Sequence, residues 1–298
     1  PEEVLITTGS QQGLDLIGKT VLNAGDGVVI EAPGYLGAIQ ALSVYQAQFH
    51  PVPLLENGIE IRVLDRTIQD NPIKVFYAIP NFQNPSGVAY SGGNRDQAAD
   101  ILRGANTLLV EDDPYGELRF RGDAQRSFRS RLPDQTVLLG SFSKTVAPAF
   151  RVGWLVAPAE LMEKLLVAKQ ASDLHTSTFC QHVLYRYLMD NDLDAHLKVI
   201  RRAYGTQRDA MVEAIQRYLP DDVVFTEPEG GMFLWVTLPG SVSTLDLFHR
   251  ALEEGVAFVP GHPFYVDREE TNTLRLNFSC VDESTSDVGI QRLAKAIV

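Results

Sequence analysis

The sequence has few cysteines, no long apolar run and no excess of positive charge. Its 298 residues include only two cysteines, Cys180 and Cys280, too few for a disulfide framework or a multi-cysteine zinc site. The six histidines show no metal-ligand spacing such as His-Glu-x-x-His. A net charge of −12 argues against a nucleic-acid-binding surface in this segment, and no apolar stretch is long enough to span a bilayer.

What is present is the composition of an ordinary soluble globular protein, with 45% hydrophobic and 21% charged residues. The length suffices for one large domain and one smaller domain, each with its own core. The chain shows no charged-then-apolar signal segment at its start, so we expect a cytoplasmic protein without a membrane partner. It opens at Pro1 without a methionine, and we expect a further segment to precede it in the natural protein.

The first two-thirds of the chain alternates short apolar runs with helical patterns. A helix is predicted over residues 10–22, where Leu14, Ile17 and Val21 share one face. Buried strands are predicted at residues 28–30, 73–79, 108–110 and 137–139. Continuous apolar strands separated by helices indicate an α/β fold, with a mostly parallel sheet between helices.

The pattern changes after about residue 165. Residues 192–219 have the apolar stripe of a long amphipathic helix. Strands are then predicted at residues 232–238 and 273–279, and helices at residues 243–254 and 284–297. We therefore expect a large domain over residues 1–190 and a small α+β domain over residues 191–298.

Polar side chains follow several of the predicted strands at the point where each strand ends. Because the carboxyl ends of parallel strands share one edge of a sheet, these side chains are expected to converge on one crevice, where ligands bind. They are Tyr35, Asn84, Asp112, Ser141, Ser143 and Lys144.

Lys144 follows a buried strand and stands beside two serine hydroxyls. A lysine in this position can serve as an amine nucleophile, since burial favours its neutral form. If residues 152–156 form an antiparallel strand, Arg151 returns to the same edge, and Ser141, Ser143, Lys144 and Arg151 gather around one phosphate. The same residues would also fit a basic loop on the surface.

Two other segments carry weaker signals of the same kind. Ser10 and Gln11 open the first helix, whose N-terminus suits a phosphate, although simple helix capping by Ser10 explains the pattern as well. Asp112 could pair with a protonated ring nitrogen and keep that ring an electron sink. The alternative is a solvated acidic turn for two of the three acids Glu111, Asp112 and Asp113.

Taken in order and spacing, these segments resemble the fold-type I aminotransferases of class I/II from Val4 to the C-terminus. The resemblance is nearest to the branch with 2-aminoadipate and kynurenine aminotransferases and the aminotransferase-like domains of MocR-type regulators. Residues 168–176 and 259–264 resemble the aminoadipate-type enzymes in particular. The resemblance implies a seven-stranded-type sheet in a large domain that binds pyridoxal 5′-phosphate, a small C-terminal domain and a homodimer. It also implies that the N-terminal part of the family fold is absent here.

The resemblance further implies a role for each matching residue. Lys144 would bind the cofactor covalently and carry the proton, Asp112 would pair with the pyridine nitrogen, and Tyr35 would stack on the ring. Tyr115 and Asn84 would hold the phenolic oxygen, and Arg275, with Asn84, would bind the substrate carboxylate. The phosphate would be held by Ser10, Gln11, Ser141, Ser143 and Arg151. Without the resemblance, Arg275 would be interpreted as a charge on an edge strand.

The expected activity is transamination between an α-amino acid, of 2-aminoadipate, aromatic or branched-chain type, and a 2-oxo acid such as 2-oxoglutarate. The same residues also allow two other interpretations. The Ser-x-x-Lys pattern of penicillin-recognising enzymes ends at Lys144, but its partner motifs Ser-Asp-Asn and Lys-Thr-Gly are missing. An effector-sensing domain of a MocR-type transcription regulator is the alternative that stays open.

Overall fold

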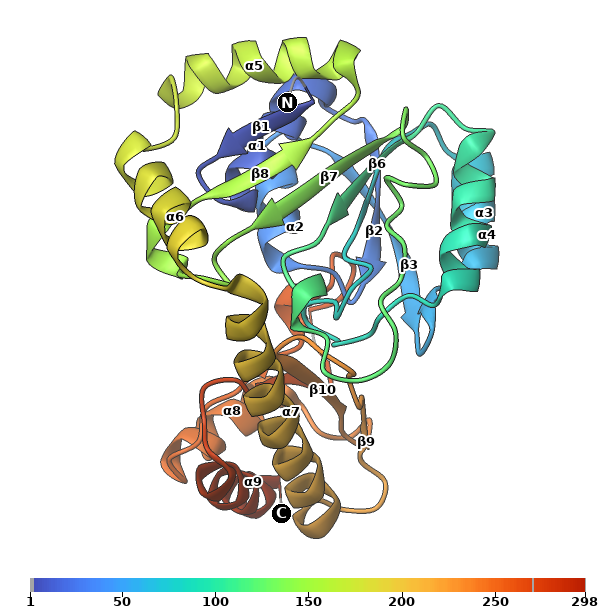
Figure 1. Cartoon of the computed structure of the whole chain (residues 1–298). Helices are drawn as coiled ribbons and strands as arrows, with labels where there is room; N and C mark the ends of the chain where they lie inside the picture. The colour runs from blue at the N-terminus through green and yellow to red at the C-terminus, as the bar shows by residue number, and fades with distance from the viewer. Residues whose placement is uncertain (1–2, 270, 298) are drawn as a thin grey trace.

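The computed structural model describes residues 3–269 and 271–297. Figure 1 shows a large sheet flanked by helices and, below it, a smaller sheet with its own helices, with the long helix α7 (Leu193–Tyr218) leading from one to the other. No helix within these described residues is long and apolar enough to cross a membrane.

Within the described ranges, eight strands form the large sheet, in the order β1-β8-β7-β6-β5-β2-β3-β4. The strands from β3 to β7 in this order run parallel, while β8 is antiparallel to both β7 and β1. The predicted mostly parallel sheet is therefore confirmed, and the strand beyond the expected seven is the two-residue β4. The strands are β1 (Val4–Thr7), β2 (Gly27–Ala32), β3 (Gln48–Leu55), β4 (Gly58–Ile59), β5 (Ile73–Ala78), β6 (Leu108–Asp112), β7 (Thr136–Ser141) and β8 (Gly153–Val156).

Helices cover both faces of this sheet. Side chains alternate along each strand, so Val28 and Ile30 pack in one core with Leu14, whereas Val29 packs in a second core with Leu64. On the first face lie α1 (Ser10–Val21), α2 (Leu36–Ser43) and α5 (Ala159–Asp173), and on the second face lie α3 (Ile61–Asp70) and α4 (Gly92–Arg103). The alternation decides which way each polar residue near a strand end points.

The smaller sheet is antiparallel, in the order β11-β12-β10-β9. It packs with α8 (Thr244–Glu253), α9 (Glu283–Ile297) and the second half of α7 in a core that includes Met211, Leu247, Leu274 and Leu293. Its strands are β9 (Val224–Phe225), β10 (Phe233–Thr237), β11 (Val259–Pro260) and β12 (Thr273–Asn277). β12 pairs on both sides, so the interpretation of Arg275 as a charge on an edge strand is wrong.

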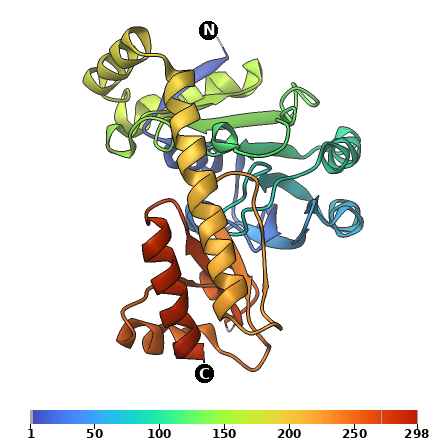
Figure 2. The same cartoon turned by 60° about the horizontal axis from the view of Figure 1, so that its bottom comes forward.

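The helix α7 contributes to both parts of the molecule. Asp192 caps its start by accepting a hydrogen bond from the Ala195 N–H at 3.0 Å. Ile200 packs against the core of the large sheet, Met211 belongs to the core of the small one, and Tyr204 contacts both. Figure 2 shows α7 running alongside both parts, so this one helix links the two cores.

Candidate active site

Polar residues gather at one edge of the large sheet, where the carboxyl ends of β1 and β7 lie beside the start of the antiparallel β8. Gly153 is paired with Thr7 on one side and with Ser141 on the other. This antiparallel return of β8, expected from the sequence, brings Arg151 back beside Ser143, whose hydroxyl accepts a hydrogen bond from Arg151 Nη1 at 3.1 Å. The Ser141 hydroxyl accepts from the Ser143 backbone N–H at 3.1 Å.

The start of α1 lies against the same arginine. A Cβ on Gly9 would stand 2.5 Å from Arg151 Nη2, and Gly9 has a φ of +76°, so this position needs glycine. Ser10 begins the helix directly afterwards, and no side chain caps that end. A guanidinium, two serine hydroxyls and a helix N-terminus with free N–H groups therefore lie together, which is a set of groups suited to a phosphate.

Gln11 is directed elsewhere in this structure. Its amide Nε2 donates to the backbone oxygen of Gly37 at 2.7 Å, at the start of α2. Tyr35 lies at the same place, because a Cβ on Gly37 would stand 2.5 Å from the Tyr35 ring. Gln11 thus connects the start of α1 to the loop that carries Tyr35.

Lys144 is the amine of this edge. Burial lowers its pKa, and the nearby positive charges of Arg151 and Arg275 lower that pKa further. Its side chain makes no hydrogen bond or ion pair within residues 3–269 and 271–297. A lysine held in this way has a larger neutral fraction near pH 7, which is the form that attacks a carbonyl and accepts a proton.

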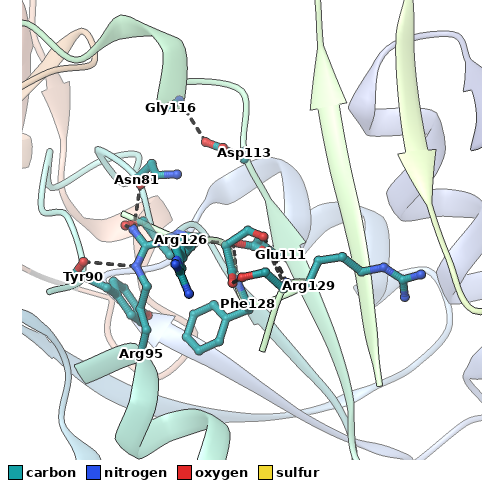
Figure 3. Close-up of polar contacts among 12 residues, drawn as sticks. Asn81, Tyr90, Arg95, Glu111, Asp113, Gly116, Arg126, Phe128 and Arg129 are labelled. Atoms are coloured by element: carbon teal, nitrogen blue, oxygen red, sulfur yellow. Dashed lines mark hydrogen bonds and ion pairs between the residues drawn. The ribbon is translucent and has the colours of Figure 1, made fainter. Parts of the chain in front are cut away.

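The three consecutive acids have different surroundings, and among the described residues Asp112 alone of the three has a buried oxygen without a hydrogen-bond partner. Its Oδ2 accepts from the Tyr77 hydroxyl at 2.8 Å, while the buried Oδ1 has no hydrogen-bond partner among the described residues. Glu111 accepts from the N–H groups of Phe128 and Arg129, each at 2.9 Å, and Asp113 from that of Gly116 (Figure 3). The alternative of a solvated turn for two of these acids is wrong for Glu111, which is fully buried because β6 lies inside the sheet.

Burial also sets the acidity of these groups. Burial raises the pKa of Asp112 to about 7, although the hydrogen bond from Tyr77 acts in the opposite direction and lowers this pKa. A buried carboxylate with an unpaired oxygen is costly, and an N–H donor at Oδ1 would offset that cost. The protonated ring nitrogen of pyridoxal phosphate is such a donor, and it would favour the charged form of Asp112.

Asn84 joins two other expected site residues. Its Nδ2 donates to the Tyr115 hydroxyl at 3.4 Å, and its Oδ1 accepts from Arg275 Nη1 at 2.7 Å. The Arg275 guanidinium carbon lies 4.2 Å from the centre of the Phe233 ring and 5.3 Å from that of Phe264. Among the residues described, the buried Arg275 Nε has no partner, so this guanidinium can bind a carboxylate with two hydrogen bonds.

Tyr35 lies among these groups. Burial raises the pKa of its hydroxyl, Asp112 raises it further, and the charges of Arg275 and Arg151 oppose that rise. The structure thus brings together all the residues expected at the site, with Gln11 alone turned toward a backbone oxygen at the start of α2.

Sequence reasoning missed two residues that support this edge. Tyr77 binds Asp112, and Gln83 binds both Glu31 and the backbone oxygen of Pro33, at 3.0 and 2.8 Å. The Gln83 Oε1 also accepts from Ser86, so this buried amide ties the loop of Tyr35 to the loop of Asn84. A tyrosine within an apolar strand and a glutamine beside Asn84 are ordinary sequence features. Nothing in the sequence marks the long-range contacts of these residues.

Comparison with known proteins identifies the family. Residues 1–293 match the model for aminotransferase class I and II, and the chain belongs to this family. It is 41% identical to aromatic-amino-acid aminotransferase 1 of Thermococcus litoralis, over 99% of this chain and 72% of that protein.

Solved structures agree with this assignment. A kynurenine aminotransferase from Pyrococcus horikoshii, in complex with PMP, superimposes with a TM-score of 0.95 at 43% identity, over 99% of this chain and 74% of that one. The α-aminoadipate aminotransferase of Thermus thermophilus, complexed with N-(5′-phosphopyridoxyl)-L-leucine, superimposes with a TM-score of 0.96 at 40% identity. The match covers 100% of this chain and 77% of that one. The protein is therefore a pyridoxal phosphate-dependent aminotransferase of fold-type I, as the sequence resemblance predicted.

The regulator alternative has weaker support. An uncharacterised helix-turn-helix regulator of Escherichia coli is 31% identical over 100% of this chain and 64% of its own length. The identity to the aminotransferases is higher and extends over more of those proteins. The described part of the chain contains no cluster of three histidine, cysteine or acidic side chains that could hold a metal ion.

Proposed function

We propose that this enzyme transfers the amino group of a 2-aminoadipate-type, aromatic or branched-chain α-amino acid to a 2-oxo acid such as 2-oxoglutarate. The observation that carries the proposal is the grouping of three functions: the partly buried amine of Lys144, the buried Oδ1 of Asp112 and the buried Nε of Arg275, the last two unpaired among the residues described. The similarity to aromatic-amino-acid and α-aminoadipate aminotransferases supports the substrate classes.

In this proposal each cofactor-binding residue contacts one part of pyridoxal phosphate. Bound pyridoxal phosphate supplies a ring that withdraws electrons from the substrate. Asp112 would accept a hydrogen bond from the ring nitrogen, Tyr35 would lie against the ring, and Asn84 and Tyr115 would donate to the phenolic oxygen. Arg151, Ser141, Ser143 and the Ser10 end of α1 would hold the phosphate. Gln11, in the first turn of α1, holds that turn against the backbone oxygen of Gly37 at the start of α2.

Lys144 is proposed to bind the cofactor and to move the proton. Burial and the positive charges of Arg151 and Arg275 lower the pKa of its Nζ. The amine would therefore be available to take a proton from the substrate Cα and return a proton to the cofactor side.

Arg275 and Asn84 are proposed to bind the substrate carboxylate. Asn84 Oδ1 holds Arg275 Nη1, which leaves the Nε edge of the guanidinium for the carboxylate oxygens. The rings of Phe233 and Phe264 lie against the guanidinium, so its plane is fixed before the substrate arrives. A fixed fork favours α-amino and 2-oxo acids over amines without a carboxylate.

We further propose a cytoplasmic homodimer. A run of exposed large apolar side chains on α5, α6 (Thr178–Asp190) and the start of α7 supports an interface. They are Leu166, Val167, Leu174, Phe179, Tyr185, Met189 and Val199. The two cysteines, free within the described ranges, are compatible with a reducing compartment. Light scattering on Phe179→Glu tests the interface: we expect a monomer, and an unchanged dimer would contradict this surface.

We also propose the division of the chain into residues 1–190 and 191–298. The large sheet ends with β8 and the small sheet begins with β9, while α7 contacts both cores. Limited proteolysis is expected to cut before α7, near residues 190–192, rather than within it.

A panel of amino donors tests the proposed activity. Each donor is incubated with the holoenzyme and 2-oxoglutarate, and glutamate formation is measured. We expect turnover with 2-aminoadipate, aromatic or branched donors and none with amines that lack a carboxylate. Spectral changes on adding amino acids without glutamate formation would instead favour the sensing domain of a regulator.

A further inference from the structure

The two carboxylate oxygens of Asp112 differ in their hydrogen bonding among the described residues. We propose that the Tyr77 hydroxyl is a positioning group that occupies Oδ2 of Asp112 and so reserves Oδ1 for the ring nitrogen of the cofactor. The inference rests on the proposed function of Asp112. Tyr77 itself does not touch the cofactor in this arrangement and acts through the carboxylate.

The strand register produces this contact. β5 and β6 are parallel, with Tyr77 opposite Val110, so Asp112 lies two residues further along β6 on the same face. The Tyr77 hydroxyl reaches Oδ2 at 2.8 Å, and both side chains are buried, at 0% and 1% exposure. Since Oδ1 has no partner in the part of the chain that is described, the carboxylate is held by one oxygen and open at the other.

The hydroxyl also affects the charge of Asp112. Burial raises the pKa of Asp112 to about 7, whereas the hydrogen bond from the Tyr77 hydroxyl lowers that pKa. The pKa of Tyr77 is itself raised well above its ordinary value, mainly by burial, so the phenol stays a donor. Asp113 raises the pKa of Asp112, and the charge of Asp112 in turn raises the pKa values of Glu31, Tyr35 and Tyr115. None of these groups is cationic.

The opposite face of the sheet offers a matched control. Tyr90, also fully buried, donates its hydroxyl to Glu31 Oε1 at 2.7 Å. Glu31 further accepts from the Ile79 N–H at 3.1 Å and from Gln83 at 3.0 Å, so both of its oxygens have partners. Tyr77→Phe and Tyr90→Phe therefore each remove one hydroxyl from a buried tyrosine–carboxylate pair, but only the first pair includes Asp112.

The test measures two quantities: the pKa of the Asp112 carboxyl in the apoenzyme and the affinity of the protein for pyridoxal phosphate. Carboxyl ¹³C shifts of labelled aspartate, assigned with Asp112→Asn, report its pKa. Loss of one hydrogen bond to a charged group is expected to raise that pKa by about one unit or more in Tyr77→Phe. The affinity for pyridoxal phosphate above pH 7 is expected to fall about tenfold. Tyr90→Phe is expected to leave both quantities unchanged while lowering the unfolding midpoint.

Two results would overturn the inference: an unchanged Asp112 pKa and cofactor affinity in Tyr77→Phe, or an equal change in Tyr90→Phe. Asp112→Asn distinguishes an error in the proposed function of Asp112 from an error in the role of Tyr77. If Asp112→Asn binds pyridoxal phosphate normally, the proposed function of Asp112 is wrong; if it binds weakly while Tyr77→Phe binds normally, only the role of Tyr77 is wrong. Should Tyr77→Phe not fold, replacing Tyr77 with 3-fluorotyrosine strengthens the donor and is expected to lower the Asp112 pKa, whereas a rise or no change would count against the role.

Discussion

Glu111 and Asp112 are neighbours on β6, and the two faces of the sheet treat them differently. Glu111 faces α4, where Phe128, Arg129 and the Arg95 guanidinium, 3.9 Å away, surround it (Figure 3). Asp112 faces the other way and receives one hydrogen bond, from Tyr77. Both are buried, so burial alone does not distinguish a functional carboxylate from a structural one. The difference is that, within the described part of the chain, both oxygens of Glu111 accept hydrogen bonds whereas only one oxygen of Asp112 does.

The same contrast holds for two lysines. Lys169 is 3% exposed in its side chain and forms an ion pair with Asp173 one turn further along α5. Lys144 is partly buried between two arginine charges and has no carboxylate partner in the described ranges. Removing the partner of a paired buried charge destabilises the fold, whereas an unpaired lysine with a lowered pKa is available for chemistry.

The largest effect is expected when this contrast is broken at Lys144. Lys144→Ala should lower transamination by about 10⁴-fold or more, because the group that moves the proton is lost. Borohydride treatment of the wild-type holoenzyme should attach the cofactor to Lys144, as peptide mass analysis would determine. Lys169→Met is the control: it should keep the label and the activity but lower the thermal midpoint. A label on any other lysine would refute the assignment of Lys144.

The next effect compares the two acids directly. Asp112→Asn should lower the rate by about 10²–10³-fold, since a charged partner of the ring nitrogen is replaced by a neutral amide. Glu111→Gln should leave the rate within a few-fold and lower the free energy of unfolding by about 3 kcal/mol, because Arg95 loses its buried counter-charge. Initial rates and urea unfolding of both variants measure the two quantities. The reverse assignment of effects would show that Glu111, not Asp112, serves the cofactor.

A smaller effect is expected at the substrate end. Arg275→Lys should raise the KM of the amino donor about 10–100-fold, because lysine lacks the fork that binds a carboxylate twice. The absorbance of the bound cofactor should stay unchanged. Arg208→Lys is the control, since Arg208 also lies over a phenylalanine ring, Phe120, away from these residues. If cofactor absorbance disappears in Arg275→Lys, the arginine is needed for the structure of the site.

The smallest effect concerns the pH dependence of apoenzyme stability. Burial raises the pKa of Glu31 to about 8 and that of Asp112 to about 7. Between pH 5 and 8 the folded state then holds protons that the unfolded state has released, so the free energy of unfolding falls as pH rises. The expected slope is about 1.4 kcal/mol per pH unit for one such group. Urea unfolding at pH 5.5 and 8 measures it, and Glu31→Gln should flatten the curve; a rise in stability with pH would contradict these shifts.

The class of fold, and the edge of the sheet at which the site lies, could be predicted from the amino-acid sequence. The predicted strands at residues 28–30, 73–79, 108–110 and 137–139 correspond to β2, β5, β6 and β7, because short β-branched and apolar runs between helices favour buried parallel strands. Asn84, Asp112 and Lys144 could be predicted to converge for a geometric reason: the carboxyl ends of parallel strands meet at one edge. Arg275 came from family resemblance alone, since its strand lies in the other sheet.

Which polar groups at that edge lack a hydrogen-bond partner depends on the tertiary structure. Asp113 accepts from the nearby Gly116 N–H, but the donors to Glu111 and Asp112 come from Phe128 and Tyr77, which are distant in sequence, so the local sequence does not distinguish Asp112 as the acid with an unpaired buried oxygen. The contact between Tyr77 and Asp112 spans 35 residues of sequence and depends on the register of β5 against β6. Hydrogen bonds at such separations depend on strand pairing and side-chain alternation together. The folded chain therefore sets the charge and the orientation of Asp112, whereas the sequence sets its place at the end of a strand.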